Sequence, residues 1–269
     1  MKKLNFESTN ILITGASSGI GKEFAKQLAA KGANLILTAR TQSDLKKLAD
    51  ELTLKHKNIW VKTVSVDLSQ QHGAQTLFST VNDMDLTVDY LINNAGIGKF
   101  CEFSGENFET YHQMLTLNIN ALVELTHLYL PRMKKYNTGG IINVASIASF
   151  QPLPYQAVYG ASKAFVLSFS EALTGELFDT NVRIMALCPG TTESRFMTNA
   201  NADTSQMNLA PASEVVSGAL VAYAKNRMFT ISGTVNYLMA YIPRIVSRKR
   251  TVKIVANMFK NSILPKQAK

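Results

Sequence analysis

Short aliphatic runs alternate with amphipathic segments along most of the chain, and this alternation is the feature that most restricts the fold. The runs have the length of buried strands, whereas the segments between them repeat apolar residues at the i, i+3, i+4 spacing of a helix. Strands that alternate with helices form a parallel sheet with right-handed crossovers and helices on both faces. The sequence therefore predicts a single-domain α/β fold with one doubly wound sheet. The expected strands are residues 10–14, 34–38, 59–66, 90–93, 141–146, 183–188 and 228–232.

The first expected strand runs directly into a glycine-rich turn, G-A-S-S-G-I-G, which a helical pattern from Lys22 to Lys31 follows. Glycines in such a turn let backbone N–H groups approach a pyrophosphate, and the helix N-terminus adds a positive dipole. The alternative for this segment is an ordinary tight turn between a strand and a helix, which has a similar composition. The expected pyrophosphate-binding residues are Gly15, Ser17, Ser18, Gly19, Ile20 and Gly21.

Tyr159 and Lys163 stand four residues apart in the string Y-G-A-S-K. On a helix this spacing places the phenol and the ammonium on one face, one turn apart. A phenol ordinarily has a pKa of about 10, and a neighbouring cation lowers that pKa because it favours the phenolate. The pair therefore predicts an acid/base centre, although the same spacing also occurs on solvated helices.

Six motifs, in order, resemble those of the short-chain dehydrogenase/reductase family, and the resemblance covers about residues 8–232. It implies a Rossmann-type sheet of about seven strands with a catalytic domain over residues 1–232. It also implies a substrate lid at about residues 191–212. The motifs are T-G-x-x-x-G-x-G at 14–21, N-N-A-G at 93–96, Asn118, Ser146, Y-x-x-x-K at 159–163 and P-G at 189–190.

The resemblance also implies a role for each candidate catalytic residue. Ser146 is expected to hydrogen-bond the substrate carbonyl, and Tyr159 is expected to exchange the proton. Lys163 is expected to lower the pKa of Tyr159 and to hold the nicotinamide ribose. Asn118 is expected to hold a water that links Lys163 to solvent; the structural alternative is a polar residue that kinks its helix.

Arg40 favours NADP(H) over NAD(H) as the cofactor. An NAD-dependent relative is expected to carry an acid at the end of the second strand, and this strand ends in L-T-A-R instead. A guanidinium there suits a 2′-phosphate, although a solvated arginine is the alternative. Asp67 is expected near the adenine, or as the N-cap of a helix over 69–81. The other expected cofactor contacts are Thr41, Asn94, Ala95, Gly96, Pro189, Gly190, Thr191 and Thr192, together with Tyr159 and Lys163.

Apolar residues in and near the expected lid indicate a lipophilic or acyl-bearing carbonyl substrate, unless they only pack on the core. The sequence thus predicts an NADP(H)-dependent oxidoreductase that interconverts a secondary alcohol and a ketone. The rival prediction is a catalytically silent dinucleotide-binding sensor or scaffold, which would not need all four catalytic residues. The apolar residues concerned are Phe150, Leu153, Phe196, Met197, Met207 and Leu209.

Positive charge is concentrated in an expected basic helical extension over residues 233–269. Residues 225–269 hold ten Lys and Arg and no Asp or Glu. A basic amphipathic helix suits an anionic membrane surface, an acidic partner or ligand, or packing on the domain with a solvated basic face. We do not expect nucleic-acid binding, because the charge is neither interleaved with aromatics nor placed on a recognisable reading element.

Two cysteines far apart in the sequence, Cys101 and Cys188, suit a reducing compartment. Together with the lack of a signal-peptide pattern, they predict a cytoplasmic protein, open to peripheral contact with the inner membrane surface. The four histidines show no metal-ligand spacing, so we expect no metal. The family resemblance implies a homodimer or homotetramer.

Overall fold

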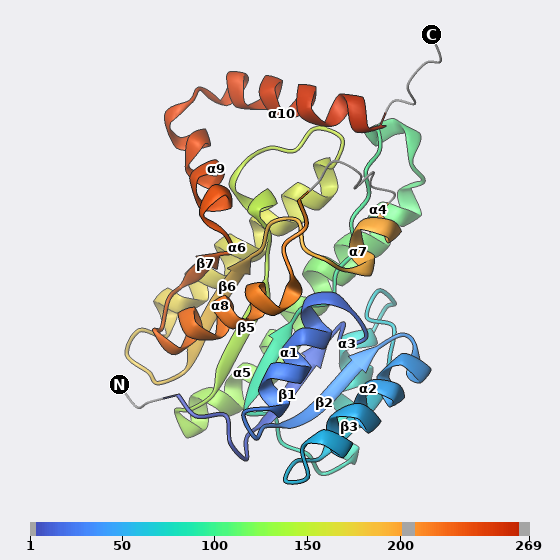
Figure 1. The fold of residues 1–269 in the computed structure, drawn as a ribbon, viewed down its shortest axis with the longest axis vertical. Helices are drawn as coiled ribbons and strands as arrows, with labels where there is room; N and C mark the ends of the chain where they lie inside the picture. Colours follow the sequence, from blue (N-terminus) through green and yellow to red (C-terminus); the bar gives the residue numbers. More distant parts are fainter. Residues whose placement is uncertain (1–3, 201–207, 264–269) are drawn as a thin grey trace.

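A computed structural model describes residues 4–200 and 208–263. In that part of the chain, seven parallel strands form one sheet in the order β3-β2-β1-β4-β5-β6-β7 (Figure 1). The order reverses between β1 and β4, where a doubly wound sheet leaves a crevice beyond the carboxyl ends of its strands. The predicted fold class is therefore confirmed. The strands are β1 Asn10–Thr14, β2 Asn34–Ala39, β3 Val61–Ser65, β4 Tyr90–Asn93, β5 Gly140–Val144, β6 Arg183–Cys188 and β7 Phe229–Ile231.

Three strands are shorter or differently placed than predicted: β7 is one residue shorter at each end, and side-chain hydrogen bonds accompany the changes in β3 and β5. β3 starts at Val61 rather than Ile59 because the backbone N–H of Trp60 donates to the Asn34 side chain at 3.1 Å. β5 ends at Val144 rather than Ser146 because Ser146 caps a short 3₁₀ helix, Ile147–Phe150.

Helices cover both faces of the sheet. Clusters of buried side chains join α1, α2 and α8 to one face and α3, α5 and α6 to the other. Among the helices of the described residues, none is long and apolar enough to cross a membrane. The helices are α1 Gly19–Ala29, α2 Gln42–Lys55, α3 Gly73–Asp83, α4 Phe108–Leu115, α5 Ala121–Tyr136, α6 Ala157–Glu176, α7 Arg195–Asn199, α8 Ala212–Ala224, α9 Thr234–Ile245 and α10 Arg248–Ile263.

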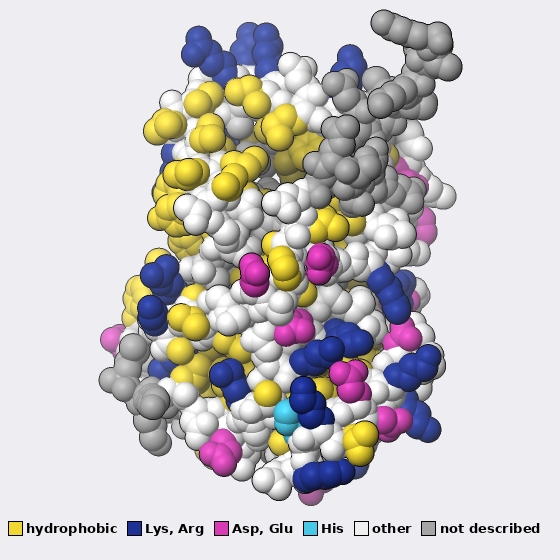
Figure 2. Space-filling view, in the orientation of Figure 1, with side chains coloured by type: hydrophobic (Ala, Val, Ile, Leu, Met, Phe, Trp, Pro, Cys, Tyr) yellow, Lys and Arg dark blue, Asp and Glu magenta, His cyan; other side chains and the backbone are white. Residues whose placement is uncertain are grey.

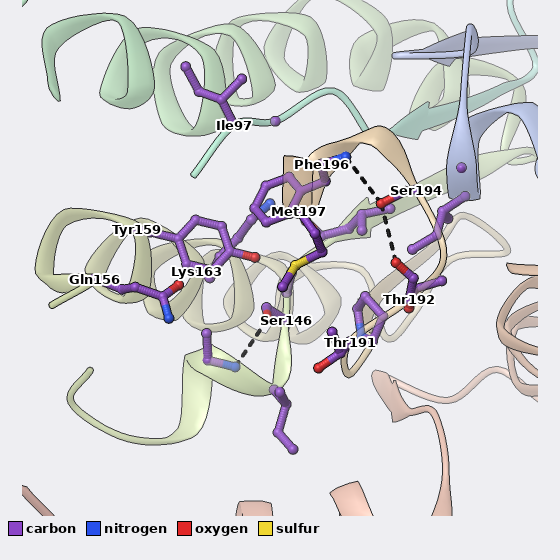
Figure 3. A pocket seen from close by; sticks show the side chains of 18 of the residues that line it. Ile97, Ser146, Gln156, Tyr159, Lys163, Thr191, Thr192, Ser194, Phe196 and Met197 are labelled. Atoms are coloured by element: carbon purple, nitrogen blue, oxygen red, sulfur yellow. Dashed lines mark hydrogen bonds between the residues drawn. The ribbon is translucent and has the colours of Figure 1, made fainter. Parts of the chain in front are cut away.

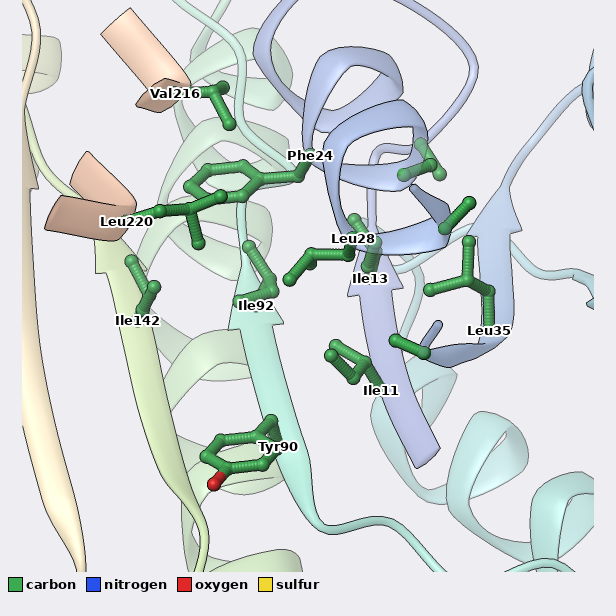
Figure 4. Packing of buried hydrophobic residues seen from close by; sticks show 14 of the residues in the cluster. Ile11, Ile13, Phe24, Leu28, Leu35, Tyr90, Ile92, Ile142, Val216 and Leu220 are labelled. Carbon is green, nitrogen blue, oxygen red and sulfur yellow. The ribbon is translucent and has the colours of Figure 1, made fainter. Parts of the chain in front are cut away.

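Alternate residues of β1 pack into different cores, as the pleat of a strand requires. Ile11 and Ile13 face α1, where Leu28 lies beside them and Phe24 extends toward α8 (Figure 4), whereas Leu12 joins the core on the opposite face. All five side chains are fully buried. Because both faces are covered, the strands are continuous apolar runs, which is the pattern that the sequence displays.

A chain of buried polar side chains crosses the centre of the sheet. The Asn93 side-chain amide donates to the Thr126 hydroxyl at 3.2 Å and to the side-chain oxygen Oδ1 of Asn143 at 3.0 Å. The Asn143 amide in turn donates to the Ser170 hydroxyl at 3.0 Å. The network therefore ties β4 to α5 and β5 to α6, two helices that cover the same face of the sheet.

Candidate active site

One cavity of about 620 Å³ lies beyond the carboxyl ends of the central strands. Its lining includes the glycine-rich turn at one end and Ser146, Tyr159 and Lys163 at the other. Every residue that the sequence predicted at the site lines this cavity, apart from Gly21 and Asn118, which lie directly behind its wall. The fold thus brings together segments that are far apart in the sequence.

The glycine-rich turn has a backbone path that other residues could not follow. Gly15 has a φ of +64°, and a Cβ on it would lie 2.8 Å from the Asn94 side-chain nitrogen. A Cβ on Gly21 would collide with the Gly15 carbonyl oxygen. Ser18 at the N-cap of α1 makes no side-chain capping bond, so the first N–H groups of the helix are not capped by it. These features fit a dinucleotide pyrophosphate.

Thr14, which begins the T-G-x-x-x-G-x-G motif but was not among the expected site residues, fixes this turn against the N-N-A-G segment. Its hydroxyl accepts hydrogen bonds from the backbone N–H groups of Asn94 and Ala95, both at 2.9 Å. The side-chain amide of Asn94 in turn donates hydrogen bonds to the backbone carbonyl oxygens of Thr14 at 2.9 Å and Gly15 at 3.1 Å. The position of Thr14, between a strand and a glycine, was the available signal for this role.

Arg40 and Asp67 follow β2 and β3 and border the same end of the cavity. The Asp67 carboxylate accepts bonds from the Ser69 backbone N–H at 2.9 Å and the Ser69 hydroxyl at 2.7 Å. Burial opposes ionisation of Asp67, but these bonds and the charge of Arg40 outweigh it and lower its pKa. Asp67 therefore caps a turn, and the prediction that it is a helix N-cap is wrong: α3 begins at Gly73, after His72 in a left-handed conformation.

Ser146, Tyr159 and Lys163 face the cavity from the end of β5 and the first turns of α6 (Figure 3). Lys163 Nζ donates to the Val144 carbonyl oxygen at 2.8 Å and lies 5.9 Å from the centre of the Tyr159 ring. The Ser146 hydroxyl accepts from the Ala148 backbone N–H at 3.1 Å. The i, i+4 spacing places Tyr159 and Lys163 on one face of α6, as predicted.

Asn118 lies in a π-helical segment, Thr116–Asn120, between α4 and α5. Its side chain accepts from the Ile97 backbone N–H at 3.0 Å and donates to the Ile97 carbonyl oxygen at 2.9 Å. It also donates to the Ser162 hydroxyl at 3.1 Å, which itself bonds the Tyr159 carbonyl oxygen at 2.7 Å. Asn118 thus lies in an irregular segment between two helices and braces the segment that carries Tyr159.

Burial dominates the electrostatics of the Tyr159–Lys163 pair. It raises the pKa of Tyr159, while hydrogen bonding with Ser146 acts in the opposite direction. Burial also lowers the pKa of Lys163 to about 8. The sequence led us to expect that Lys163 lowers the pKa of Tyr159, but in this structure burial raises the pKa of the phenol, and the opposing contribution comes from Ser146.

The pKa of Lys163 makes a prediction about stability. A lysine whose pKa falls from 10.5 to about 8 on folding disfavours the folded state below about pH 8, and this penalty disappears as the pH rises from 8 towards 10.5. Lys163→Met removes the penalty. We expect the unfolding free energy of the variant, relative to the original chain, to fall by about 3 kcal/mol across that window. Urea denaturation at a series of pH values measures it. A difference between Lys163→Met and the original chain that did not change with pH would contradict the assignment.

The outer wall of the cavity comes partly from the expected lid. Phe196 and Met197 of α7 line it, and the Phe196 ring centre lies 5.4 Å from that of Tyr159. Of the other apolar residues that the sequence indicated, Leu153 lines the cavity, whereas Phe150 packs on Phe229 instead. Leu209 is not among the lining residues. Met207, and with it residues 201–207 of the expected lid, lies outside the described residues.

Sequence reasoning missed several lining residues, including Gln156 and all those of α9 and α10. Gln156, nearly buried, lines the cavity beside Tyr159 (Figure 3). Residues of α9 and α10 close the cavity opposite the sheet, although no local motif marks them. Across residues 4–200 and 208–263, no group of three or more His, Cys, Asp or Glu side chains could hold a metal ion. The lining residues from these two helices are Asn236, Met239, Ile242, Pro243, Thr251, Ile254, Val255, Met258 and Phe259.

The sheet order, the glycine-rich turn and the neighbouring Ser, Tyr and Lys side chains define a nucleotide-dependent oxidoreductase fold. The chain matches the family model described as short chain dehydrogenase over residues 9–205. It therefore belongs to the short-chain dehydrogenase/reductase family, as the resemblance of its motifs implied.

Relatives within this family carry different activities. Sulfoacetaldehyde reductase 2 of Chromohalobacter salexigens is 36% identical over 188 residues, which cover 69% of this chain and 73% of that protein. Very-long-chain 3-oxoacyl-CoA reductase of Neurospora crassa is also 36% identical over 188 residues, which cover 68% of this chain but only 56% of that protein. A short-chain dehydrogenase from Sphingobium yanoikuyae, solved in complex with NADPH, has a TM-score of 0.79 at 30% identity. That match covers 97% of this chain and 98% of that chain.

Proposed function

We propose that this protein is an NADP(H)-dependent oxidoreductase that interconverts a secondary alcohol and a ketone, chiefly by reducing a lipophilic or acyl-bearing carbonyl. The observation that carries the proposal is that Ser146, Tyr159 and Lys163 line the same cavity as the glycine-rich turn. The family and its relatives support a reductase or dehydrogenase. A dinucleotide would be held at its pyrophosphate by the turn and at its nicotinamide ribose by Tyr159 and Lys163.

The bound nicotinamide would supply hydride to the carbonyl carbon, and the protein's own residues would manage the oxygen and the proton. Ser146 donates a hydrogen bond to the carbonyl oxygen, which stabilises the negative charge that develops there. Tyr159 transfers its phenolic proton to that oxygen, so that C=O becomes CH–OH. The positive charge of Lys163 stabilises the phenolate that remains. The high pKa of Tyr159 keeps the phenol protonated, which suits a proton donor in reduction.

The substrate class is argued from the cavity wall. Near Tyr159 the wall is formed by Phe196, Met197 and Leu153, and Gln156 adds a polar group beside them. Apolar walls with few polar groups bind the body of a lipophilic ligand and orient its polar end. NADPH oxidation with a panel of lipophilic ketones and 3-oxoacyl thioesters tests the proposal. Cofactor binding without turnover on the whole panel would instead support a dinucleotide sensor.

Arg40→Ala is expected to weaken NADPH binding by about 10- to 100-fold while leaving NADH binding unchanged. The exposed guanidinium borders the cavity, and a charge-assisted hydrogen bond to a 2′-phosphate contributes about 1.5–3 kcal/mol. Fluorescence titration with both cofactors measures the two dissociation constants. Lys47→Ala, which removes another exposed cation from the neighbouring helix α2, is the matched control. An unchanged ratio of the two constants in Arg40→Ala would rule out this basis for cofactor choice.

A further inference from the structure

Helices α9 and α10 follow each other around a corner and lie beyond the carboxyl ends of the strands, at one end of the molecule (Figure 1); the two helices together are called the hairpin below. The hairpin has an inner side, where Met239, Pro243, Val255 and Phe259 line the cavity. Ala240 and Val255 are almost fully buried on this side. The hairpin is therefore attached to the domain through packing of its inner side, and its outer side is available to bind a partner.

The outer side of α9 is an apolar stripe. Val235, Leu238, Ile242 and Ile245 follow one another at i, i+3, i+7 and i+10, a spacing that places them on one helix face. Their exposed fractions are 70%, 62%, 45% and 86%. Apart from Ile242, none of the four lines the cavity, so their exposure is to the outside. Such a contiguous exposed row of aliphatic side chains is typical of an interaction surface.

The outer side of α10 carries positive charge. Lys249, Lys253 and Lys260 lie at i, i+4 and i+11 on one helix face, and all three are exposed. Arg248 and Arg250 add two further exposed cations at the start of the helix. No acidic residue follows Glu214 in the sequence to neutralise them. Figure 2 shows hydrophobic side chains gathered over α9, with Lys and Arg side chains along the upper edge, over α10.

We infer that the α9–α10 hairpin docks on an anionic lipid bilayer, with the α9 stripe inserted at the headgroup boundary and the α10 cations on the lipid phosphates. An apolar stripe beside a row of lysines has the composition of a helix that lies in the plane of a membrane. Anionic headgroups complement the charge of α10. A second copy of this chain fits less well, because a two-fold contact through this face would bring both sets of cations together.

Sedimentation with lipid vesicles tests the inference. The full chain is expected to co-sediment with vesicles that contain phosphatidylglycerol, more weakly with vesicles of phosphatidylcholine alone, and less as salt rises. Lys249→Gln, Lys253→Gln and Lys260→Gln together should lower the partition coefficient about 100-fold, since each cation near an anionic surface contributes about fivefold. Leu238→Ser with Ile245→Ser should also abolish most of the binding.

Matched controls separate docking from general surface effects. Leu54 on α2 is 73% exposed, so Leu54→Ser removes a comparable apolar side chain far from the hairpin. Lys46→Gln, Lys55→Gln and Lys57→Gln remove the same number of exposed charges near that helix. Both controls should bind vesicles like the original chain, and all variants should keep the same affinity for NADPH because none of these residues lines the cavity.

Two results would overturn the inference: an original chain that stays in the supernatant with anionic vesicles, or hairpin variants that sediment like their controls. Light scattering in the absence of lipid tests whether a second copy of this chain, instead of a membrane, occupies the α9 stripe. If Leu238→Ser with Ile245→Ser turned a larger oligomer into a smaller one, the stripe would be a contact between copies. None of these measurements depends on turnover. A protein that does not bind vesicles could therefore still be a reductase, and a protein without reductase activity could still bind vesicles.

Discussion

Tyr159→Phe is expected to lower kcat/KM for ketone reduction by about 10²- to 10⁴-fold, the usual effect of removing a positioned proton donor. The ring and its contact with Phe196 remain, so the change removes only the hydroxyl. Because the pKa of this phenol is raised by burial, the proton is present to be donated throughout the neutral range. Steady-state NADPH oxidation with a reactive ketone measures the loss.

Tyr155→Phe is the matched control for this prediction. Tyr155 lies four residues before Tyr159 and outside the lining of the main cavity, so loss of its hydroxyl should leave kcat/KM nearly unchanged. NADPH affinity, measured by fluorescence, shows that each variant still folds and binds cofactor. If Tyr159→Phe kept more than about a tenth of the activity, Tyr159 would not be the proton donor.

Ser146→Ala is expected to lower kcat/KM by about 10²- to 10³-fold, the range seen when one hydrogen-bond donor to a developing oxyanion is removed. The loss should fall mainly on kcat, since the carbonyl oxygen gains its negative charge in the transition state. Single-turnover mixing of the NADPH complex with substrate measures the hydride step directly.

Ser149→Ala provides the comparison, because the Ser149 hydroxyl bonds the backbone carbonyl of Lys163 at 2.7 Å and does not line the cavity. We expect it to change the rate by less than about tenfold, the scale of one ordinary hydrogen bond. Equal losses of activity in the two serine variants would mean that Ser146 maintains the structure of the segment that follows β5 rather than contacting the substrate.

Local patterns in the sequence predicted the fold and half of the site. The aliphatic runs predicted the sheet because strands buried on both faces are continuously apolar. The role of Gly15 and Gly21 in the turn could be predicted from their spacing, because each allows a close contact that a Cβ would block. The spacing of Tyr159 and Lys163 was sufficient because both belong to one helix, whose geometry is fixed.

Features that depend on distant contacts were not predictable in the same way. The start of α3 was misplaced because the left-handed conformation of His72 has no sequence signal. The raised pKa of Tyr159 depends on burial by surrounding segments rather than on its nearest cation. The cavity wall from α9 and α10 was missed because only the tertiary fold places that hairpin opposite the sheet.

The polar chain through Asn93, Asn143 and Ser170 has a consequence for how accurately the reacting groups are placed. Apolar contacts between a helix and a sheet tolerate small sliding movements, whereas directional bonds between buried amides and hydroxyls are satisfied in one alignment. Ser170 stands two turns beyond Lys163 on α6. The hydrogen bonds from the sheet thereby fix the position of α6, and with it the position of the Tyr159 phenol relative to the strands. The accuracy with which the reacting groups are placed therefore depends on buried residues that touch no ligand.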